Sequence, residues 1–382
     1  MRVITLRQKK LSGQNAMKTH NNQRILFLDG LRGIAILMVV LYHTYSSAWQ
    51  ELMPFYQPTF DFPLIKFGDL GVPLFFIISG FVIVMTLEKC QSLSDFMFKR
   101  WLRLFPAMLI ATLLILITAP LFTARPLGDV KLIDSLPGLT FISHFFYKNV
   151  IGPEVSVLEN GFWSLFVEVK FYLLAGWLYF LIGQKRMIIA LTVMFFSFVA
   201  FGLVQSRLSP ETLVVMIEVM DCLDYQYYGW FVAGALFYRY YNSKHVMTLI
   251  AAVLMALLSA RTWGGLMSQT MLAFIVIIGI FSGAMVSEKL QKILSNKVLT
   301  FVGFISYPLY LIHENMTIST IVQLHDQFAS INVYVLSILP LTACVLISWL
   351  IAQYAEPAMR STLKNLFTPK ARITRPIGFI TT

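Results

Sequence analysis

The sequence has too few charged residues for a water-soluble fold. Lys, Arg, Asp and Glu together make up 13% of the 382 residues, whereas 57% of the residues are hydrophobic. An ordinary soluble domain carries roughly a quarter charged residues. Long apolar runs recur along nearly the whole chain, and a run of about 20 such residues crosses a bilayer core ~30 Å thick as a helix. The composition therefore predicts an all-α polytopic membrane protein.

Cysteine is also scarce. Cys90, Cys222 and Cys344 lie far apart in the sequence, and none has a neighbouring metal-ligand residue in a pattern such as Cys-x-x-Cys. This spacing excludes a disulfide framework and predicts no metal site, so the three thiols are interpreted as core or lipid-facing residues.

Basic residues are plentiful but scattered. The net charge of +11 is spread between apolar spans and is not gathered into one patch interleaved with aromatic residues. That distribution argues against a nucleic-acid partner. Membrane topology explains it better, because the cytoplasmic flanks of membrane helices hold an excess of Lys and Arg.

The apolar runs predict about ten transmembrane helices. Their expected ranges are 31–49, 69–88, 104–122, 160–182, 187–205, 225–241, 246–260, 266–286, 298–320 and 331–353. With both termini in the cytoplasm, 23 of the 30 Lys and Arg residues fall on the cytoplasmic side. We therefore expect both termini to be cytoplasmic.

The chain is expected to form one membrane domain with two tails. Residues 1–26 form a basic tail without the short apolar region of a cleavable signal, residues 27–356 form the ten-helix domain, and residues 357–382 form a second cytoplasmic tail. The long outward stretch 123–159 contains a half-apolar run, 136–150. This run is expected to form an interfacial or re-entrant helix.

The first span carries two ionisable residues on one face. Arg32 and His43 are eleven positions apart, which is three helical turns plus about 20°. They are ~16 Å apart along the helix axis, so Arg32 lies near the cytoplasmic mouth and His43 near the bilayer centre. A buried ionisable group is costly in a membrane and is therefore a functional candidate. The alternative is a topology anchor together with a histidine that only packs against another helix.

Two further spans carry polar residues of interest. Arg100 and Arg103 are one turn apart at the expected start of a helix, where such a pair can clamp phosphate or can simply be a basic flank. Glu168 and Lys170 lie inside an apolar helix two positions apart, so they cannot pair on one face. Glu168 is therefore expected to face another helix. Ser79 lies beside a glycine, a pattern that favours close packing of helices.

The last two spans add a smaller set of polar residues. Tyr310 and His313 are one turn apart in a proline-containing segment that is expected to line a cavity. Glu356 lies just beyond the last span, where its carboxylate can orient a histidine or bind an arginine. Taken alone, each of these patterns is weak.

Taken in order, these segments resemble the acyltransferase 3 family of integral membrane O-acyltransferases. The matching motifs are Asp29-Gly-Leu-Arg32-Gly with His43, Phe75-Phe-x-x-Ser79-Gly-Phe81, Arg100-x-x-Arg103, Trp163-Ser-Leu-x-x-Glu168-x-x-Phe171-Tyr172, Ser306-Tyr-x-Leu-Tyr310-x-x-His313, and Glu356-Pro. Each motif is common by itself, but the series is specific. The resemblance covers roughly residues 24–360.

The resemblance implies transfer of an acyl group, usually acetyl, from cytoplasmic acetyl-CoA to a hydroxyl of a cell-surface or lipid-linked glycan. Acetyl-CoA is then a co-substrate, and no permanently bound cofactor is expected. The implied catalytic residues are His43 and Glu356, and the implied acyl-CoA ligands are Arg32, Arg100 and Arg103. Supporting roles fall on Asp29, Ser79, Trp163, Glu168, Tyr310 and His313. His43 serves either as a general base or as an acyl carrier.

The resemblance also implies a bacterial inner-membrane location. Many relatives carry an additional extracytoplasmic SGNH-type domain, which this sequence is expected to lack. We therefore expect the acceptor to be a lipid-linked sugar or lipopolysaccharide O-antigen.

Two other classes of function remain open at this point. A transporter or flippase for a small anion or lipid-linked sugar accounts for charges inside the membrane, although no transporter-type repeat is visible. A structural or sensory membrane protein has no use for ionisable groups at these spacings. Binding of acetyl-CoA separates the three interpretations.

Overall fold

The computed structural model is all helical in the part of the chain that it describes, namely residues 25–45, 49, 51–53, 63–205, 216–217, 220, 223–264 and 268–367. Seven helices or helical stretches are long and apolar enough to cross a membrane. The prediction of an all-α membrane protein is therefore confirmed. Cys222 and most of both tails lie outside the described residues.

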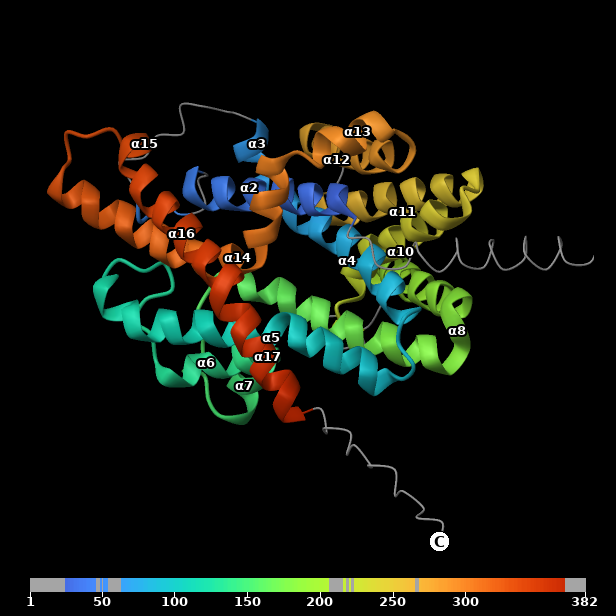
Figure 1. Cartoon of the computed structure of the whole chain (residues 1–382), viewed down its shortest axis with the longest axis horizontal. Coiled ribbons are helices and arrows are strands. Elements are labelled where there is room, and N and C mark those ends of the chain that lie inside the picture. The colour runs from blue at the N-terminus through green and yellow to red at the C-terminus, as the bar shows by residue number, and fades with distance from the viewer. Residues whose placement is uncertain are drawn as a thin grey trace, which may run out of the picture.

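Figure 1 shows the long helices, most of which overlap the expected spans. They are α2 (Leu26–Tyr45), α4 (Gly71–Leu87), α5 (Leu93–Thr118), α8 (Trp163–Val204), α10 (Tyr228–Ser243), α11 (Val246–Gly264), α12 (Ser268–Val286), α14 (Lys297–Gln327), α16 (Ile338–Leu350) and α17 (Glu356–Phe367). Shorter helical elements join them: α3 (Pro63–Lys66), η3 (Gly68–Leu70), η4 (Ala119–Leu121), η5 (Leu132–Asp134), α6 (Ser135–Thr140), α7 (His144–Val150), η6 (Asn160–Phe162), η8 (Tyr225–Tyr227), α13 (Glu288–Leu294), α15 (Val333–Leu336) and the π-helical turn η9 (Ile351–Ala355).

Helix α8 has a break that separates two of the expected spans. Gly183 has φ 81° and ψ 164°, which interrupts the helix between two arms. Only glycine adopts this region of backbone conformation readily, because it has no Cβ. The expected spans 160–182 and 187–205 are therefore the two arms of α8.

Helix α5 begins eleven residues earlier than the sequence analysis predicted. Ser92 caps it, because the Ser92 Oγ accepts a hydrogen bond from the Asp95 backbone N–H at 3.2 Å. The predicted start at residue 104 was wrong because the polar residues before it were interpreted as a connection. Arg100 and Arg103 therefore lie within a continuous helix, which holds their side chains at a fixed spacing.

Close crossings between helices set the position of α2. Helix α2 packs against α14 and α4, and α4 packs against α10. A Cβ atom added to Gly303 of α14 would lie 1.9 Å from the Asp29 carbonyl oxygen on α2, and one added to Gly33 would lie 2.2 Å from the Leu299 oxygen. These distances leave no room for any side chain. The backbones of α2 and α14 touch, as small residues permit in membrane helices.

This crossing gives the first prediction. A Gly303→Val substitution is expected to prevent stable assembly, because the new side chain meets the backbone of α2 and neither helix can yield. The measurement is the yield of monodisperse protein after mild detergent extraction.

Gly279→Val is the matched control. A Cβ at Gly279, on α12, has no neighbouring atom within 4 Å. Normal yield from Gly303→Val would show that the α2–α14 crossing is not needed for assembly.

The outward stretch 123–159 folds into two short helices, α6 and α7, where one interfacial or re-entrant helix was expected. Phe145 and Phe146 on α7 are exposed, as an interfacial position requires. The ends of this stretch are fixed to α14. The Leu127 N–H donates to the Asn315 Oδ1 at 3.2 Å, and the Asn315 Nδ2 donates to the Glu159 Oε2 at 2.7 Å.

Candidate functional site

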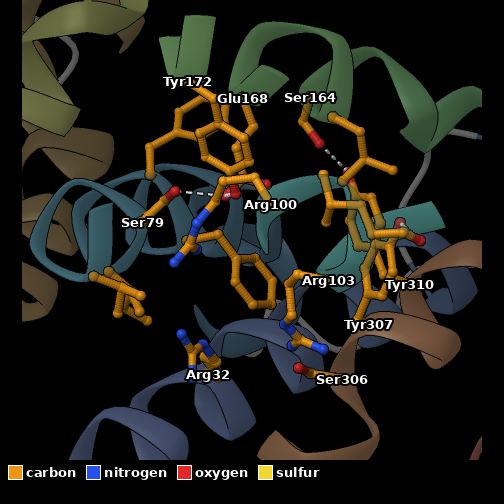
Figure 2. Close-up of a pocket in the computed structure, with 16 residues that line it drawn as sticks. Arg32, Ser79, Arg100, Arg103, Ser164, Glu168, Tyr172, Ser306, Tyr307 and Tyr310 are labelled. Carbon is orange, nitrogen blue, oxygen red and sulfur yellow. Dashed lines mark hydrogen bonds between the residues drawn. The ribbon is translucent and has the colours of Figure 1, made fainter. Parts of the chain in front are cut away.

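A cavity of about 100 Å³ lies where α2, α4, α5, α8 and α14 meet. Figure 2 shows the polar side chains around it, which come from all five helices. The polar lining residues are Arg32, Ser79, Arg100, Arg103, Ser164, Glu168, Tyr172, Ser306, Tyr307 and Tyr310. Six of them were candidates from the sequence alone, so the fold brings together residues that lie up to 278 positions apart.

Three arginines converge on this cavity. Arg32 reaches it from α2, and Arg100 and Arg103 reach it from α5 (Figure 2). The Arg32 NH1 donates to the Asp29 Oδ1 at 2.9 Å, which places Asp29 in a supporting position. The like charges of Arg32 and Arg103 are close enough to repel each other. Such a cluster of cations is stabilised by an anion in the cavity.

Arg100 has unused hydrogen-bonding capacity. Its NH2 donates to the Thr86 hydroxyl, and its guanidinium lies over the rings of Phe96 and Tyr172, each at 5.7 Å. Its buried Nε has no hydrogen-bond partner among the described residues. No salt bridge to Arg100 is present in the described part of the chain. This guanidinium is therefore the least neutralised cation of the three.

Glu356 lies among the arginines. Its Oε1 is 3.3 Å from the Arg103 NH1, and it also accepts a hydrogen bond from Arg360 one turn along α17. The π-helical turn η9 directly before it sets the angle at which α17 leaves α16. A histidine and an arginine were both open as partners of Glu356, and in the structure Glu356 pairs with the arginine Arg103. The catalytic role that the resemblance implies for Glu356 stays a prediction.

Glu168 faces another helix, as expected. Its Oε1 accepts hydrogen bonds from the Ser79 hydroxyl on α4 and from the Tyr172 hydroxyl, both at 2.5 Å. Ser79 thus serves as a hydrogen-bond donor in addition to lying at a close crossing. Lys170 faces elsewhere and pairs with Asp224 at 2.8 Å. The two charges in this span therefore have separate partners.

One end of the cavity is closed by Tyr310. Its hydroxyl donates to the Gly161 carbonyl at 2.8 Å and lies 2.7 Å from the Ser164 hydroxyl (Figure 2). Trp163, the residue before Ser164, is not in the cavity lining. Its ring packs against Phe76, Tyr227 and Trp263, with ring centroids 5.4 to 6.3 Å apart. Trp163 is thus part of an aromatic cluster beside the site.

His43 and His313 lie directly behind Tyr310. The Tyr310 and His313 ring centroids are 6.0 Å apart, and the His43 Nδ1 is 2.8 Å from the His313 Nε2. The two imidazoles come from α2 and α14, whose backbones touch. His43 is therefore held by a hydrogen bond to another buried side chain, three turns along α2 from Arg32.

The contacts of this pair define its tautomers. The His313 Nδ1 is 3.1 Å from the carbonyl oxygens of Leu309 and Tyr310, which can only accept. The proton of a neutral His313 is therefore on Nδ1, which leaves its Nε2 as an acceptor. It follows that the His43 Nδ1 carries the shared proton and donates to His313. The His43 Nε2 is then unprotonated and free to accept a proton.

A carboxylate that was not among the candidates from the sequence lies beside this nitrogen. The Glu314 Oε1 is 3.9 Å from the His43 Nε2, and the Glu314 Oε2 accepts a hydrogen bond from the Gly161 N–H at 3.3 Å. The available signal was its position inside an apolar span directly after His313. An intramembrane carboxylate should have been treated as a candidate on that ground alone.

Glu159 is a second missed carboxylate, just outside the membrane spans. It is 1% exposed and accepts hydrogen bonds from the Asn315 backbone N–H at 3.1 Å and from its side chain at 2.7 Å. Burial raises the pKa of Glu159 to about 8, and the nearby Glu314 carboxylate adds to the rise. These hydrogen bonds tie the 123–159 stretch to α14, which is a structural role.

Comparison with known proteins gives one family match and several partial relatives. A family model described as an acyltransferase domain matches residues 25–353. The peptidoglycan O-acetyltransferase OatA of Listeria monocytogenes is 30% identical over 159 residues, which is 38% of this chain and 23% of that protein. The O-acetyltransferase OatA of Staphylococcus aureus strain NCTC 8325 is 29% identical over 157 residues, and a putative O-acetyltransferase of strain COL is 28% identical over 159 residues. Each alignment covers 38% of this chain and 23% of the relative. No solved structure matches this chain.

Proposed function

Because the chain belongs to the acyltransferase 3 family of membrane O-acyltransferases, we propose that it transfers an acetyl group from acetyl-CoA to a hydroxyl of a cell-surface or lipid-linked glycan. The observation that carries this proposal is the cavity, in which three arginines lie at one end and the histidine pair lies behind the other. The names of the relatives support O-acetylation. Lipopolysaccharide O-antigen is the narrower prediction for the acceptor, whereas the name of the Listeria relative specifies peptidoglycan.

The arginines are proposed to bind the phosphate groups of the donor. CoA carries a 3′-phosphate and a pyrophosphate, and guanidinium groups bind phosphate oxygens through paired, charge-assisted hydrogen bonds. Arg100 has an unpaired buried N–H, and the repulsion between Arg32 and Arg103 is relieved by a bound anion. Glu356 holds Arg103 in place through its ion pair. In this proposal Glu356 is a positioning residue for donor binding.

His43 is proposed as the catalytic residue. The acceptor hydroxyl oxygen attacks the thioester carbonyl carbon while the hydroxyl proton passes to the His43 Nε2. The carbon–sulfur bond then breaks, and the same proton passes from Nε2 to the leaving thiolate to give CoA. In an alternative with a covalent intermediate, the unprotonated Nε2 attacks the thioester carbonyl carbon and the carbon–sulfur bond breaks to release the CoA thiolate. The acceptor hydroxyl oxygen then attacks the acetyl carbon, the carbon–nitrogen bond breaks, and the hydroxyl proton passes to the thiolate to give CoA. Both routes need the tautomer that His313 imposes.

This role of His313 gives the second prediction. A His313→Leu variant is expected to lower kcat by about 100-fold or more, because the His43 N–H loses its acceptor and the imidazole is no longer held in one tautomer. His313→Gln is expected to retain more activity than His313→Leu, because its amide oxygen can still accept from the His43 Nδ1. Acetyl-CoA affinity, measured in parallel, should be unchanged in both. Equal loss in the two variants would contradict the tautomer argument.

We also propose ten membrane spans with both termini in the cytoplasm of a bacterial inner membrane. The total of seven apolar helices includes α8 once, although Gly183 divides it, and does not include α10 or α14. Counting both arms of α8 and adding these two helices gives ten. The excess of Lys and Arg on the side of the termini supports the orientation. In this proposed orientation, the arginine end of the cavity faces the cytoplasm, from which acetyl-CoA would enter.

Acetyl-CoA binding by the purified protein tests the proposal. Detergent-purified protein is incubated with acetyl-CoA labelled in the acetyl group, and binding, hydrolysis and transfer are followed. We expect saturable binding that unlabelled CoA displaces. If the well-folded protein binds no acetyl-CoA, the acyltransferase proposal fails and transport of an anion or lipid-linked sugar becomes the better account.

A further inference from the structure

The Glu314 carboxylate faces the proposed catalytic nitrogen with one oxygen unused. Glu314 is 1% exposed, and its Oε1 has no hydrogen-bond partner among the described residues. The other oxygen is bound to the Gly161 N–H on a neighbouring segment, which fixes the plane of the group. Leaving a buried carboxylate oxygen unpaired is costly, so this orientation needs a donor that arrives with a ligand.

Glu314 and His43 place two hydrogen-bond acceptors side by side. The His43 Nε2 is unprotonated in the tautomer that His313 imposes, and it lies 3.9 Å from the Glu314 Oε1. Two lone pairs at this distance cannot bond to each other. Together they form a site for a molecule that offers two hydrogen-bond donors side by side.

A third group near this site complements the two acceptors. The side chains of Trp49 and Asn160 lie close to the Glu314 carboxylate, and the buried Trp49 Nε1 makes no hydrogen bond of ordinary geometry to a described residue. A hydroxyl group both donates and accepts, so it can donate to the Glu314 Oε1 and accept from an indole N–H. A simple cation would satisfy the carboxylate but would leave the indole N–H unpaired. The combination therefore favours a hydroxyl.

We propose that Glu314 binds a second hydroxyl of the acceptor, next to the hydroxyl that His43 deprotonates. This inference rests on the proposed function and specifies its acceptor as a glycan segment with two neighbouring free hydroxyl groups. One hydroxyl donates to the His43 Nε2 and becomes acetylated, while the other donates to the Glu314 Oε1 and keeps its proton. Glu314 is thus a specificity-determining residue, because an acceptor with a single hydroxyl leaves its carboxylate oxygen unpaired.

The test compares two small alcohols as acceptors. Purified protein in lipid vesicles is given labelled acetyl-CoA with either 1,2-ethanediol or ethanol, which have the same primary hydroxyl as the attacking group. The measured quantity is the ratio of the two acetylation rates at equal concentration. A hydrogen bond to a charged group in a buried site changes a rate constant by about tenfold or more. We therefore expect the diol to react at least about tenfold faster with the unaltered protein.

Glu314→Asp is the informative variant. It keeps the carboxylate but withdraws it by one methylene, so the ratio of the diol rate to the ethanol rate is expected to fall toward one, whatever the absolute rate of each alcohol. Glu159→Gln is the matched control, because it alters the neighbouring buried carboxyl, which accepts hydrogen bonds from Asn315. It should leave the ratio of the two rates unchanged. Binding of acetyl-CoA at the arginine end of the cavity is measured for each variant to verify that it is folded.

The outcomes separate this inference from the proposed function. Acetylation of both alcohols with the same ratio in the unaltered protein and in Glu314→Asp would overturn the role of Glu314 while leaving acyl transfer intact. An equal fall of the diol-to-ethanol rate ratio in Glu159→Gln would also overturn the role of Glu314. The effect would then not be specific to the carboxylate oxygen that faces His43. Absence of acetyl-CoA binding would instead contradict the proposed function.

Discussion

A His43→Ala variant is expected to bind acetyl-CoA with unchanged affinity and to lose acetyl transfer by about 1,000-fold or more. Removal of a general base at a positioned hydroxyl typically costs 10² to 10⁴ in rate, and removal of an acyl carrier would cost at least as much. Donor affinity should be preserved because Arg32 lies three helical turns from His43 along α2, and neither histidine is among the residues that line the arginine cavity. The measurement is transfer of labelled acetyl under single-turnover conditions, with equilibrium binding of acetyl-CoA measured on the same preparation.

His245→Ala is the control for this experiment. His245 is exposed in the short connection between α10 and α11, and its backbone bonds only to Ser243 and Thr248 among the described residues, neither of which lines the cavity. Its variant should have full activity. Full activity from a well-expressed His43→Ala protein would contradict the assignment of His43 as the catalytic residue.

A double Arg100→Gln, Arg103→Gln variant is expected to raise the dissociation constant of acetyl-CoA by about 100-fold or more. Each lost charge-assisted hydrogen bond costs about 1.5 to 3 kcal/mol, and the two residues share the same cavity. The turnover number at saturating donor should change far less than the affinity, because neither arginine contacts the histidine pair. Equilibrium binding and steady-state kinetics at varied donor concentration measure the two quantities separately.

A donor that lacks the 3′-phosphate distinguishes phosphate binding from a general loss of structure. The unaltered protein should bind acetyl-dephospho-CoA more weakly than acetyl-CoA, and the double variant should discriminate less between them. Arg261→Gln, which removes an exposed arginine at the end of α11, should behave as the unaltered protein does. Unchanged discrimination in the double variant would contradict phosphate binding by Arg100 and Arg103.

Much of the fold followed from local sequence patterns. Apolar runs of membrane-spanning length gave the positions of the long helices, because in lipid only a helix satisfies its own backbone groups. The eleven-residue spacing of Arg32 and His43 gave their shared face, because it depends only on helix periodicity. The start of α5 was misplaced because hydropathy does not report a helix that continues beyond the apolar core, whereas the Ser92 cap does.

The contacts within the site depend on crossings that no local pattern reveals. His43 meets His313 because α2 and α14 touch at Gly33 and Gly303, and those glycines are far apart in sequence. Glu314 follows His313 directly, yet its position beside the His43 Nε2 becomes visible only when the two helices are placed together. Glu356 could be given a histidine or an arginine as its partner from the sequence, and its ion pair with Arg103 becomes visible only once α5 and α17 are placed together.

Acetyl transfer across a sealed membrane tests the central claim most directly, namely that the arginine cavity and the histidine pair pass an acetyl group from a cytoplasmic donor to an acceptor on the other side. The protein is reconstituted in sealed vesicles with known orientation, labelled acetyl-CoA is supplied on the side of the termini, and a glycan acceptor is supplied on the opposite side. The account predicts that label appears on the glycan, that CoA stays with the donor, and that His43→Ala abolishes the transfer. If label reaches the glycan only when both substrates are on the same side, or if His43→Ala transfers as well as the unaltered protein, the account is contradicted.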